Sequence, residues 1–220
     1  GRELFNAPTR GIKLDFVRKL TGRHPRIHNL SEWLLSAVLV PIVEIDGVLH
    51  ILFEIRSSKL ERQPGEICFP GGRIELDELA HPQRTAVRET VEELGIHSDQ
   101  VVLLGPLDFQ MGPPGTWIFP YLGFIEDFKG VTPNPLEVED TFLAPMDHFI
   151  EPKGSNTVEV AVRYINFPFE KLPDSYRERE NWFKQWSYTN YYYEYGEHFI
   201  WGVTARILKN VMSLYSQLQC

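Results

Sequence analysis

Two apolar runs joined by Asp46-Gly47 place the strongest constraint on what this chain can fold into. Residues 36–56 read SAVLVPIVEIDGVLHILFEIR, with β-branched residues on both sides of the dipeptide. Asp-Gly between two such runs is typical of a two-residue hairpin turn, because both turn positions need a positive φ. The sequence therefore predicts two strands paired as a hairpin.

The same kinds of pattern predict the other elements. Apolar and β-branched runs predict strands at 67–72, 101–107, 117–125, 141–146, 157–169 and 188–201. Amphipathic periodicity predicts helices at 11–20, 82–94 and 203–218. Strands mixed with a few helices indicate an α/β or α+β fold with one core. We expect an N-terminal helix and connector at 1–30, followed by one domain at 31–220.

Composition narrows the classes of function. The net charge is −8, which argues against a general nucleic-acid-binding surface. Two cysteines, Cys68 and Cys220, are too few for a disulfide framework or a thiolate metal site, so we expect a reducing, cytoplasmic location. No run approaches the ~20 apolar residues of a membrane span, so no membrane partner is expected. An anionic small-molecule substrate would need a cation or well-placed arginines.

The end of the 82–94 helix carries an unusual concentration of acid. Glu89, Glu92 and Glu93 fall within five residues, in the stretch RETVEELG. Helix C-termini carry partial negative charge, and like charges three or four residues apart repel. We expect the three carboxylates to face a single region, opposite the buried stripe of the helix. The predicted stripe consists of Val87, Val91 and Leu94.

From the residues alone, two interpretations of the cluster stay open. A Glu-rich helix is most often a solvated acidic face. A hard divalent cation would instead turn the repulsion into binding, since Mg²⁺ prefers a few carboxylates together with waters and phosphate oxygens. Gly71 and Gly72, shortly before the helix, either let the backbone approach a ligand or form an ordinary turn. We favour a functional site, because the cluster breaks two local rules at once.

Taken together, residues 72–96 resemble the Nudix box, whose pattern is G-x5-E-x7-R-E-U-x-E-E-x-G-U, where U is a bulky apolar residue. The matching residues are Gly72, Arg88, Glu89, Glu92, Glu93, Gly95 and Ile96. The segment from Gly72 to Arg88 is two residues longer than the pattern, and the first U position holds Thr90. Ala80 stands where the family has its first glutamate, so Asp77 or Glu78 is expected to pair with the arginine instead.

The resemblance extends to the coenzyme A diphosphatase branch of the Nudix hydrolases. In that branch an Arg-Ser segment and a Gly-Glu-x-x-Phe-Pro-Gly-Gly run precede the box. The matching residues are Arg56, Ser57, Gly65, Glu66, Phe69, Pro70, Gly71 and Gly72. Similar stretches cover most of residues 36–208. One position differs, because Glu61 stands where the branch usually has arginine, and Arg62 follows it.

The resemblance implies a fold and a set of site residues. The fold would be a mixed β-sheet between helices, with the box as loop–helix–loop. The implied ligands of Mg²⁺ or Mn²⁺ are Glu89, Glu92, Glu93 and the carbonyl of Gly71. The implied catalytic residues are Glu92, Arg88, which orients the glutamates, and Glu137, as a further ligand or the general base. The candidates for substrate binding are Arg56, Ser57, Arg62 and Gly72.

The implied activity is metal-dependent hydrolysis of a diphosphate. Coenzyme A or an acyl derivative would give phosphopantetheine and adenosine 3′,5′-bisphosphate. Two alternatives stay open. One is another substrate, such as ADP-ribose or NADH, and it stays open because Glu61 departs from the pattern of the coenzyme A branch. The other is a sensor that binds a nucleotide without turning it over. We expect His198 to be structural, and the aromatic region 157–201 is a candidate homodimer interface.

Overall fold

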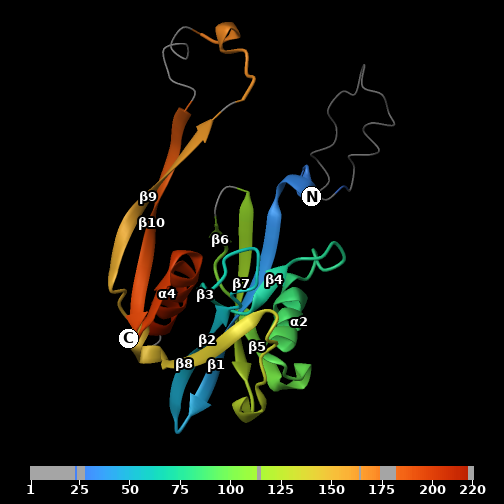
Figure 1. The fold of residues 1–220 in the computed structure, drawn as a ribbon, viewed down its shortest axis with the longest axis vertical. Coiled ribbons are helices and arrows are strands. Elements are labelled where there is room, and N and C mark those ends of the chain that lie inside the picture. Colours follow the sequence, from blue (N-terminus) through green and yellow to red (C-terminus); the bar gives the residue numbers. More distant parts are fainter. Residues whose placement is uncertain (1–22, 24–27, 113–114, 164, 174–181, 218–220) are drawn as a thin grey trace, which may run out of the picture. The chain divides into compact units, whose positions relative to one another are not determined.

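The computed structural model describes residue 23 and residues 28–112, 115–163, 165–173 and 182–217. The chain divides into two compact units, Gly1–Trp33 and Leu34–Cys220. The described part of the first unit contains a short 3-10 helix, Leu30–Glu32 (η1). The helix predicted at 11–20 lies outside the described residues. The second unit contains both sheets and all the candidate site residues (Figure 1).

The elements that the structure describes in the second unit are strands β1–β11, helices α2 and α4, and four short 3-10 helices. The strands are Leu34–Ile45 (β1), Val48–Arg56 (β2), Ile67–Cys68 (β3), Gly71–Arg73 (β4), Val101–Pro106 (β5), Gln110–Met111 (β6), Thr116–Ile125 (β7), Val138–Pro145 (β8), Gly154–Arg163 (β9), Trp182–Tyr195 (β10) and His198–Trp201 (β11). The helices are Pro82–Leu94 (α2) and Gly202–Ser216 (α4). The 3-10 helices are Ser98–Gln100 (η2), Phe128–Gly130 (η3), Met146–Phe149 (η4) and Phe169–Lys171 (η5).

The hairpin predicted around Asp46-Gly47 is confirmed. Strands β1 and β2 pair antiparallel, with Ile45 opposite Val48. The φ of Asp46 is 51° and that of Gly47 is 79°, both in the region that this turn requires. Aspartate tolerates that region better than most side chains, and glycine has no Cβ to oppose it. The turn is therefore determined by its own two residues.

The strands form two sheets. In the larger sheet the order is β3-β2-β1-β7-β5, while β4 pairs with β1, β6 with β7 and β8 with β2. Strands β1 and β7 run parallel, and the other pairs of this sheet are antiparallel. The smaller sheet has the order β11-β10-β9 and is antiparallel. The larger sheet is therefore mixed, as predicted.

Successive side chains of β2 enter two different cores, because side chains alternate between the faces of a strand. Leu52 packs in a cluster with Leu94 of α2. Phe53 packs in a larger cluster with Leu208 of α4. The mixed sheet thus lies between the two helices, which confirms the predicted α+β architecture. The site is built on the α2 face.

Four segments differ from the sequence-based prediction. The strand expected at 67–72 is split into β3, which pairs with β2, and β4, which pairs with β1. The strand expected at 157–169 is β9, which ends at Arg163. The strand expected at 188–201 is split into β10 and β11 by a turn in which Gly196 has a φ of 58°. Strand β6 lies in the Pro/Gly-rich segment 110–117, where no strand was predicted, and pairs with β7. A two-residue strand leaves too little periodicity for its sequence to reveal it.

Candidate active site

Local signals define both ends of helix α2. Pro82 begins the helix, where its fixed φ suits the first turn and no N–H is needed. Gly95 ends it with a φ of 62°, and its backbone N–H donates to the carbonyl of Val91. A side chain on Gly95 would collide with the carbonyl of Thr132, so the close approach also requires glycine. The predicted bounds of this helix are confirmed.

A later loop is fastened to the C-terminus of α2. The amide of Thr132 donates to the carbonyl of Leu94 at 2.9 Å, and the amide of Asn134 donates to the carbonyl of Glu93 at 2.8 Å. These bonds satisfy carbonyls that a helix end otherwise leaves without partners. They also hold the segment that carries Glu137 beside the acidic end of the helix.

The buried face of α2 differs from the predicted stripe, and that prediction was wrong in part. The residues that the helix buries are Thr85, Ala86, Thr90, Glu93 and Leu94. Val87 and Val91 are only half-buried. The helix packs against β1 and β4, and small side chains at 86 and 90 suit a close approach. The hydroxyl of Thr90 is satisfied within the helix, since it donates to the carbonyl of Ala86 at 2.7 Å.

The three glutamates of α2 differ in how far they are exposed to solvent. Glu93 belongs to the buried face and is 6% exposed. The side chain of Glu89 is 18% exposed, whereas that of Glu92 is 55% exposed. Glu89 and Glu93 are therefore the inner carboxylates, and Glu92 lies toward solvent.

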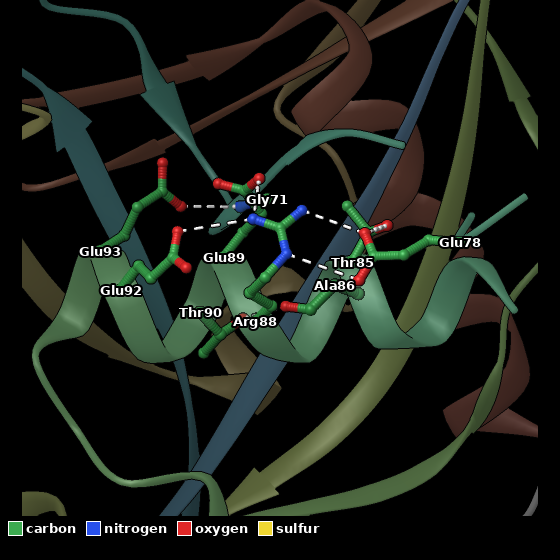
Figure 2. A network of polar contacts seen from close by, with 9 residues as sticks. All are labelled: Gly71, Glu78, Thr85, Ala86, Arg88, Glu89, Thr90, Glu92 and Glu93. Carbon is green, nitrogen blue, oxygen red and sulfur yellow. Dashed lines mark hydrogen bonds and ion pairs between the residues drawn. The ribbon is translucent and has the colours of Figure 1, made fainter. Parts of the chain in front are cut away.

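Arg88 bonds to three carboxylates around the start and middle of this site (Figure 2). Its Nη2 lies 3.1 Å from Glu78, and its Nη1 lies 2.8 Å from Glu89 and 3.4 Å from Glu92. Glu78 also accepts a 2.6 Å hydrogen bond from the hydroxyl of Thr85. The hydrogen bonds from Arg88 and Thr85 lower the pKa of Glu78. Of the two residues that the sequence offered as partners of Arg88, the contact is made by Glu78.

The inner carboxylates lie against Gly71 and Gly72, which belong to strand β4 and pair with β1. Oε2 of Glu93 accepts a 2.8 Å hydrogen bond from the amide of Gly71 (Figure 2). Burial nevertheless raises the pKa of Glu93 to about 8. Burial also raises the pKa of Glu89, against the opposing effect of Arg88. A Cβ on Gly72 would collide with the carboxylate of Glu89, so only glycine leaves this space for Glu89.

A third inner carboxylate, Glu54, was missed in the sequence. It lies in β2 and is 1% exposed. Burial raises its pKa well above the usual range, and the nearby charge of Glu93 adds to the effect. The sequence did hold a signal, because Glu54 is the charged residue inside the apolar run ILFEI. A strand buried on both faces has little reason to carry a carboxylate unless the site uses it.

Of the acidic residues near 137, Glu137 is the one placed near the inner carboxylates. Its charge contributes to the raised pKa of Glu54, Glu89 and Glu93. The neighbouring acids are occupied elsewhere. Glu139 accepts a hydrogen bond from the amide of Ser58 at 3.0 Å, and Asp140 accepts one from the amide of Thr141 at 2.8 Å.

The substrate-binding candidates lie at the end of β2 and in the turn after it. Arg56 is half-buried, and its positive charge opposes the raised pKa of Glu54 and Glu93. Ser57 is buried, and its amide donates to the carbonyl of Glu137 at 2.8 Å. Arg62 is exposed, and its carbonyl accepts from Nη2 of Arg56 at 3.4 Å. The β2 end and the Glu137 loop are therefore joined beside the carboxylates.

The comparison with protein families decides the family. A family model described as NUDIX domain matches residues 34–181, more than half of the chain. The chain belongs to the Nudix family. The matched region contains α2, strand β4 with Gly71 and Gly72, and the loop that carries Glu137. The resemblance to the Nudix box is therefore confirmed.

Several relatives of this Nudix chain are coenzyme A diphosphatases by name. A peroxisomal one from Mus musculus is 38% identical over 120 residues, 53% of this chain and 49% of the mouse protein. The chain thus spans about half the length of that relative. A mitochondrial one from Homo sapiens is 30% identical over 184 residues, 81% of this chain and 68% of the human protein. These similarities confirm the resemblance to that branch of the family.

A solved Nudix structure shares the fold. The crystal structure of a MutT/nudix family protein from Enterococcus faecalis has a TM-score of 0.52 and 14% identity to this chain. The likeness covers 94% of this chain and 71% of that one. At this identity the comparison concerns the fold alone, and it agrees with the mixed sheet between helices.

The Nudix family implies a divalent cation, and the donor set of this site suits one. Carboxylate oxygens are the ligands that hard cations prefer. Oε1 of Glu54 is buried without a hydrogen-bond partner among the described residues. Within that same part of the chain, no three His, Cys, Asp or Glu side chains are already grouped to hold a metal ion. Glu89 is turned toward Arg88 and Glu93 toward the Gly71 amide, so binding would exchange these contacts for the cation.

Other features lie apart from the inner carboxylates. A cavity of about 510 Å³ lies on the outer side of α2, and its lining includes Val87, Arg88, Val91 and Leu103. The ring of His198 stacks on Phe142 at 3.8 Å between centroids, which agrees with a structural role. Across the described residues, neither helix combines the length and apolar character that crossing a membrane requires.

Proposed function

We propose that this Nudix chain hydrolyses the diphosphate of coenzyme A or acyl-coenzyme A with the help of Mg²⁺ or Mn²⁺. The products would be phosphopantetheine and adenosine 3′,5′-bisphosphate. The observation that carries the proposal is the placement of the Glu89 and Glu93 carboxylates against Gly71 and Gly72 of β4. The names of the mouse and human relatives support coenzyme A as the substrate.

Glu89 and Glu93 are the residues we propose as the main cation ligands. Glu93 is buried and the side chain of Glu89 is 18% exposed, and both carboxylates lie next to Gly71 and Gly72. A bound divalent cation would neutralise the diphosphate and lower the pKa of a bound water. We retain the carbonyl of Gly71 as a further ligand. Glu92 is more exposed and fits a peripheral or water-mediated role.

The reaction replaces one P–O bond with another. Water attacks one phosphorus, the bond from that phosphorus to the bridging oxygen breaks, and the other phosphate leaves with the bridging oxygen. The water proton passes to a carboxylate acting as general base. We propose Glu137 for this role, because it is the loop acid placed near the inner carboxylates. Glu92 is the alternative base.

Arginines have two separate roles in this proposal. Arg88 positions Glu89, with Glu78 holding the guanidinium from its other side. Arg56 and Arg62 bind the phosphates, since a guanidinium fork matches phosphate oxygens. Arg56 is the stronger candidate, because its Nε is buried without a hydrogen-bond partner among the described residues. Ser57 and Gly72 would line the same side of the substrate. The hydrolase domain is assigned to 31–220.

The decisive experiment is a mass-resolved product assay. The protein is incubated separately with coenzyme A, ADP-ribose and NADH, each with Mg²⁺ or with EDTA, and Glu93→Gln serves as the matched variant. Release of phosphopantetheine that needs both the cation and Glu93 is the expected result. Turnover of ADP-ribose or NADH alone would keep the reaction and discard coenzyme A. Tight nucleotide binding without turnover would replace the proposal by a sensor.

A further inference from the structure

Glu54 is a buried carboxyl group to which the proposed reaction assigns no role. It stands in β2, inside a run of four successive buried residues that begins at Ile51. It is 1% exposed, less than Glu93 at 6%. Removing a carboxylate from water is unfavourable unless another group compensates for the charge. A carboxyl group in this position therefore needs a compensating group in order to be ionised.

The direction of the Glu54 side chain follows from strand alternation. Leu52 packs on the α2 side of the sheet, in a cluster with Leu94. Glu54 is two residues further along the same strand, so it faces the same side. Glu93 precedes Leu94 on that helix and belongs to its buried face. Among the neighbouring charges, that of Glu93 has the largest effect on the pKa of Glu54. The two carboxylates therefore share one buried region.

The described part of the chain does not supply the missing partner. Oε1 of Glu54 has no hydrogen-bond partner there. Arg56 is the cation whose charge acts on Glu54, but the Nε of Arg56 is also without a partner among the described residues, and its Nη2 donates to the carbonyl of Arg62. No ion pair within 4.0 Å joins Glu54 to a cation among the described residues. Glu54 therefore lies in the same buried region as Glu93, and its Oε1 has no hydrogen-bond partner among the described residues.

We propose that Glu54 is an additional carboxylate ligand of the divalent-cation site, together with Glu89 and Glu93. This inference rests on the cation dependence proposed above. It gives the site a ligand from the central sheet as well as those from α2. A cation at this position would compensate the buried charge of Glu54 and the repulsion between Glu54 and Glu93.

The test is the affinity of the purified chain for Mn²⁺, measured by isothermal titration calorimetry without substrate. The variant is Glu54→Gln, which keeps the shape and removes the charge. The matched control is Glu44→Gln, the same change at an exposed position of neighbouring β1. We expect Glu54→Gln to weaken Mn²⁺ binding about 10–100-fold, and Glu44→Gln to leave it unchanged. The rise in Tm that Mn²⁺ causes should shrink in the same order.

The metal-free variants separate a ligand from a structural residue. If Glu54 is a ligand, Glu54→Gln and Glu54→Leu will be at least as stable without metal as the parent chain. A marked loss of stability in both variants would overturn the inference, because Glu54 would then hold the fold. Unchanged Mn²⁺ affinity in Glu54→Gln would overturn it as well.

The same titration distinguishes this inference from the proposed function. If the parent chain binds Mn²⁺ and Glu93→Gln does not, the proposed cation site stands, and the result for Glu54→Gln decides the role of Glu54 alone. If the parent chain does not bind Mn²⁺ at all, the proposed cation dependence fails and the inference fails with it.

Discussion

Two carboxylates beside helix α2 differ in how the protein stabilises them: Glu78, in the segment before the helix, here called the outer side, and Glu93, in its last turn, here called the inner side. On the outer side, Glu78 receives hydrogen bonds from Arg88 and Thr85, and its pKa is lowered. On the inner side, Glu93 receives one hydrogen bond, from the Gly71 amide, and burial raises its pKa to about 8. The outer carboxylate is stabilised as an anion by the protein, whereas the inner one is not.

The difference shows what separates a structural acid from a site acid in this molecule. Both sides are rich in glutamate, so acidity alone does not distinguish them. The number of hydrogen-bond donors around each carboxylate distinguishes them, because a carboxylate that already has its donors does not need a further cation. Glu89 stands between the two sides, since it bonds to Arg88 yet lies against Gly72. The outer network thus positions an inner ligand.

The largest expected effect is on catalysis and compares Glu93→Gln with Glu78→Gln. Glu93→Gln should lower kcat/KM for coenzyme A on the order of 10²–10³-fold, as for other placed groups that stabilise charge in the transition state. Glu78→Gln should lower it only about tenfold, because Glu78 acts through Arg88. Steady-state rates at saturating Mg²⁺ measure both. Equal losses of kcat/KM in the two variants would contradict the distinction between the inner and outer carboxylates.

The next effect is on the pH dependence of stability without metal. The pKa of Glu93 is raised from 4.5 to about 8, so the folded state holds this proton while the unfolded state releases it. The free energy of unfolding should therefore fall between pH 5 and 8, by roughly a few kcal/mol at most, since one pKa unit is about 1.4 kcal/mol. Urea denaturation in EDTA at several pH values measures it.

Two controls sharpen the pH prediction. Glu93→Gln should reduce the slope, because one of the groups that lose a proton is gone, while Glu54 and Glu89 still contribute. Mg²⁺ should restore stability most at the high end of the range, since it binds the ionised carboxylates. Stability that instead rises from pH 5 to 8 in EDTA would mean that the inner carboxylates are already compensated by the protein.

A smaller effect is expected on the outer side. Glu78→Gln should lower the free energy of unfolding by about 1–2 kcal/mol, because it weakens hydrogen bonds to a charged group at a partly exposed site. Asp77→Asn, one residue earlier, is the control and should change stability by less than about 0.5 kcal/mol. The pKa of Glu78 is lowered, so its contribution is present above pH 4.5 and is lost as the pH falls further. Unfolding curves at pH 7 and pH 3 give both results.

The features that the sequence predicted well are those with local causes. Asp46 and Gly47 specify their own turn, and Pro82 and Gly95 specify the ends of α2. The box pattern led directly to the family. The domain limits, the cytoplasmic location and the dimer interface remain predictions, because nothing in the fold of one chain tests them.

The features that the sequence did not give depend on packing between distant segments. Periodicity marked Val87 and Val91 as buried, but α2 turns its smaller side chains toward the sheet. The choice of Glu78 over Asp77 depends on how the segment before α2 approaches Arg88. Glu54 stands far from the box in the chain, and only the pairing of strands brings it to the α2 side.

The smallest expected effect compares two buried threonines of α2. The hydroxyl of Thr85 donates to the Glu78 carboxylate at 2.6 Å, and that of Thr90 donates to the carbonyl of Ala86 at 2.7 Å. Replacing each by valine keeps the shape. Thr85→Val should cost about 1 kcal/mol, because a charged acceptor loses a donor. Thr90→Val should cost less than about 0.5 kcal/mol, since helical back-bonding of this kind adds little stability.

Comparing the two threonines separates the effect of the hydrogen-bond acceptor from the effect of burial, because both side chains are fully buried on one helix. Chemical denaturation of the two single variants and the double variant measures the difference and its additivity. If Thr90→Val costs as much as Thr85→Val, hydroxyl burial governs the result and the charge of Glu78 contributes nothing extra. If Thr85→Val also raises the pKa of Glu78, as followed by NMR, the outer carboxylate owes its low pKa to the donors named here.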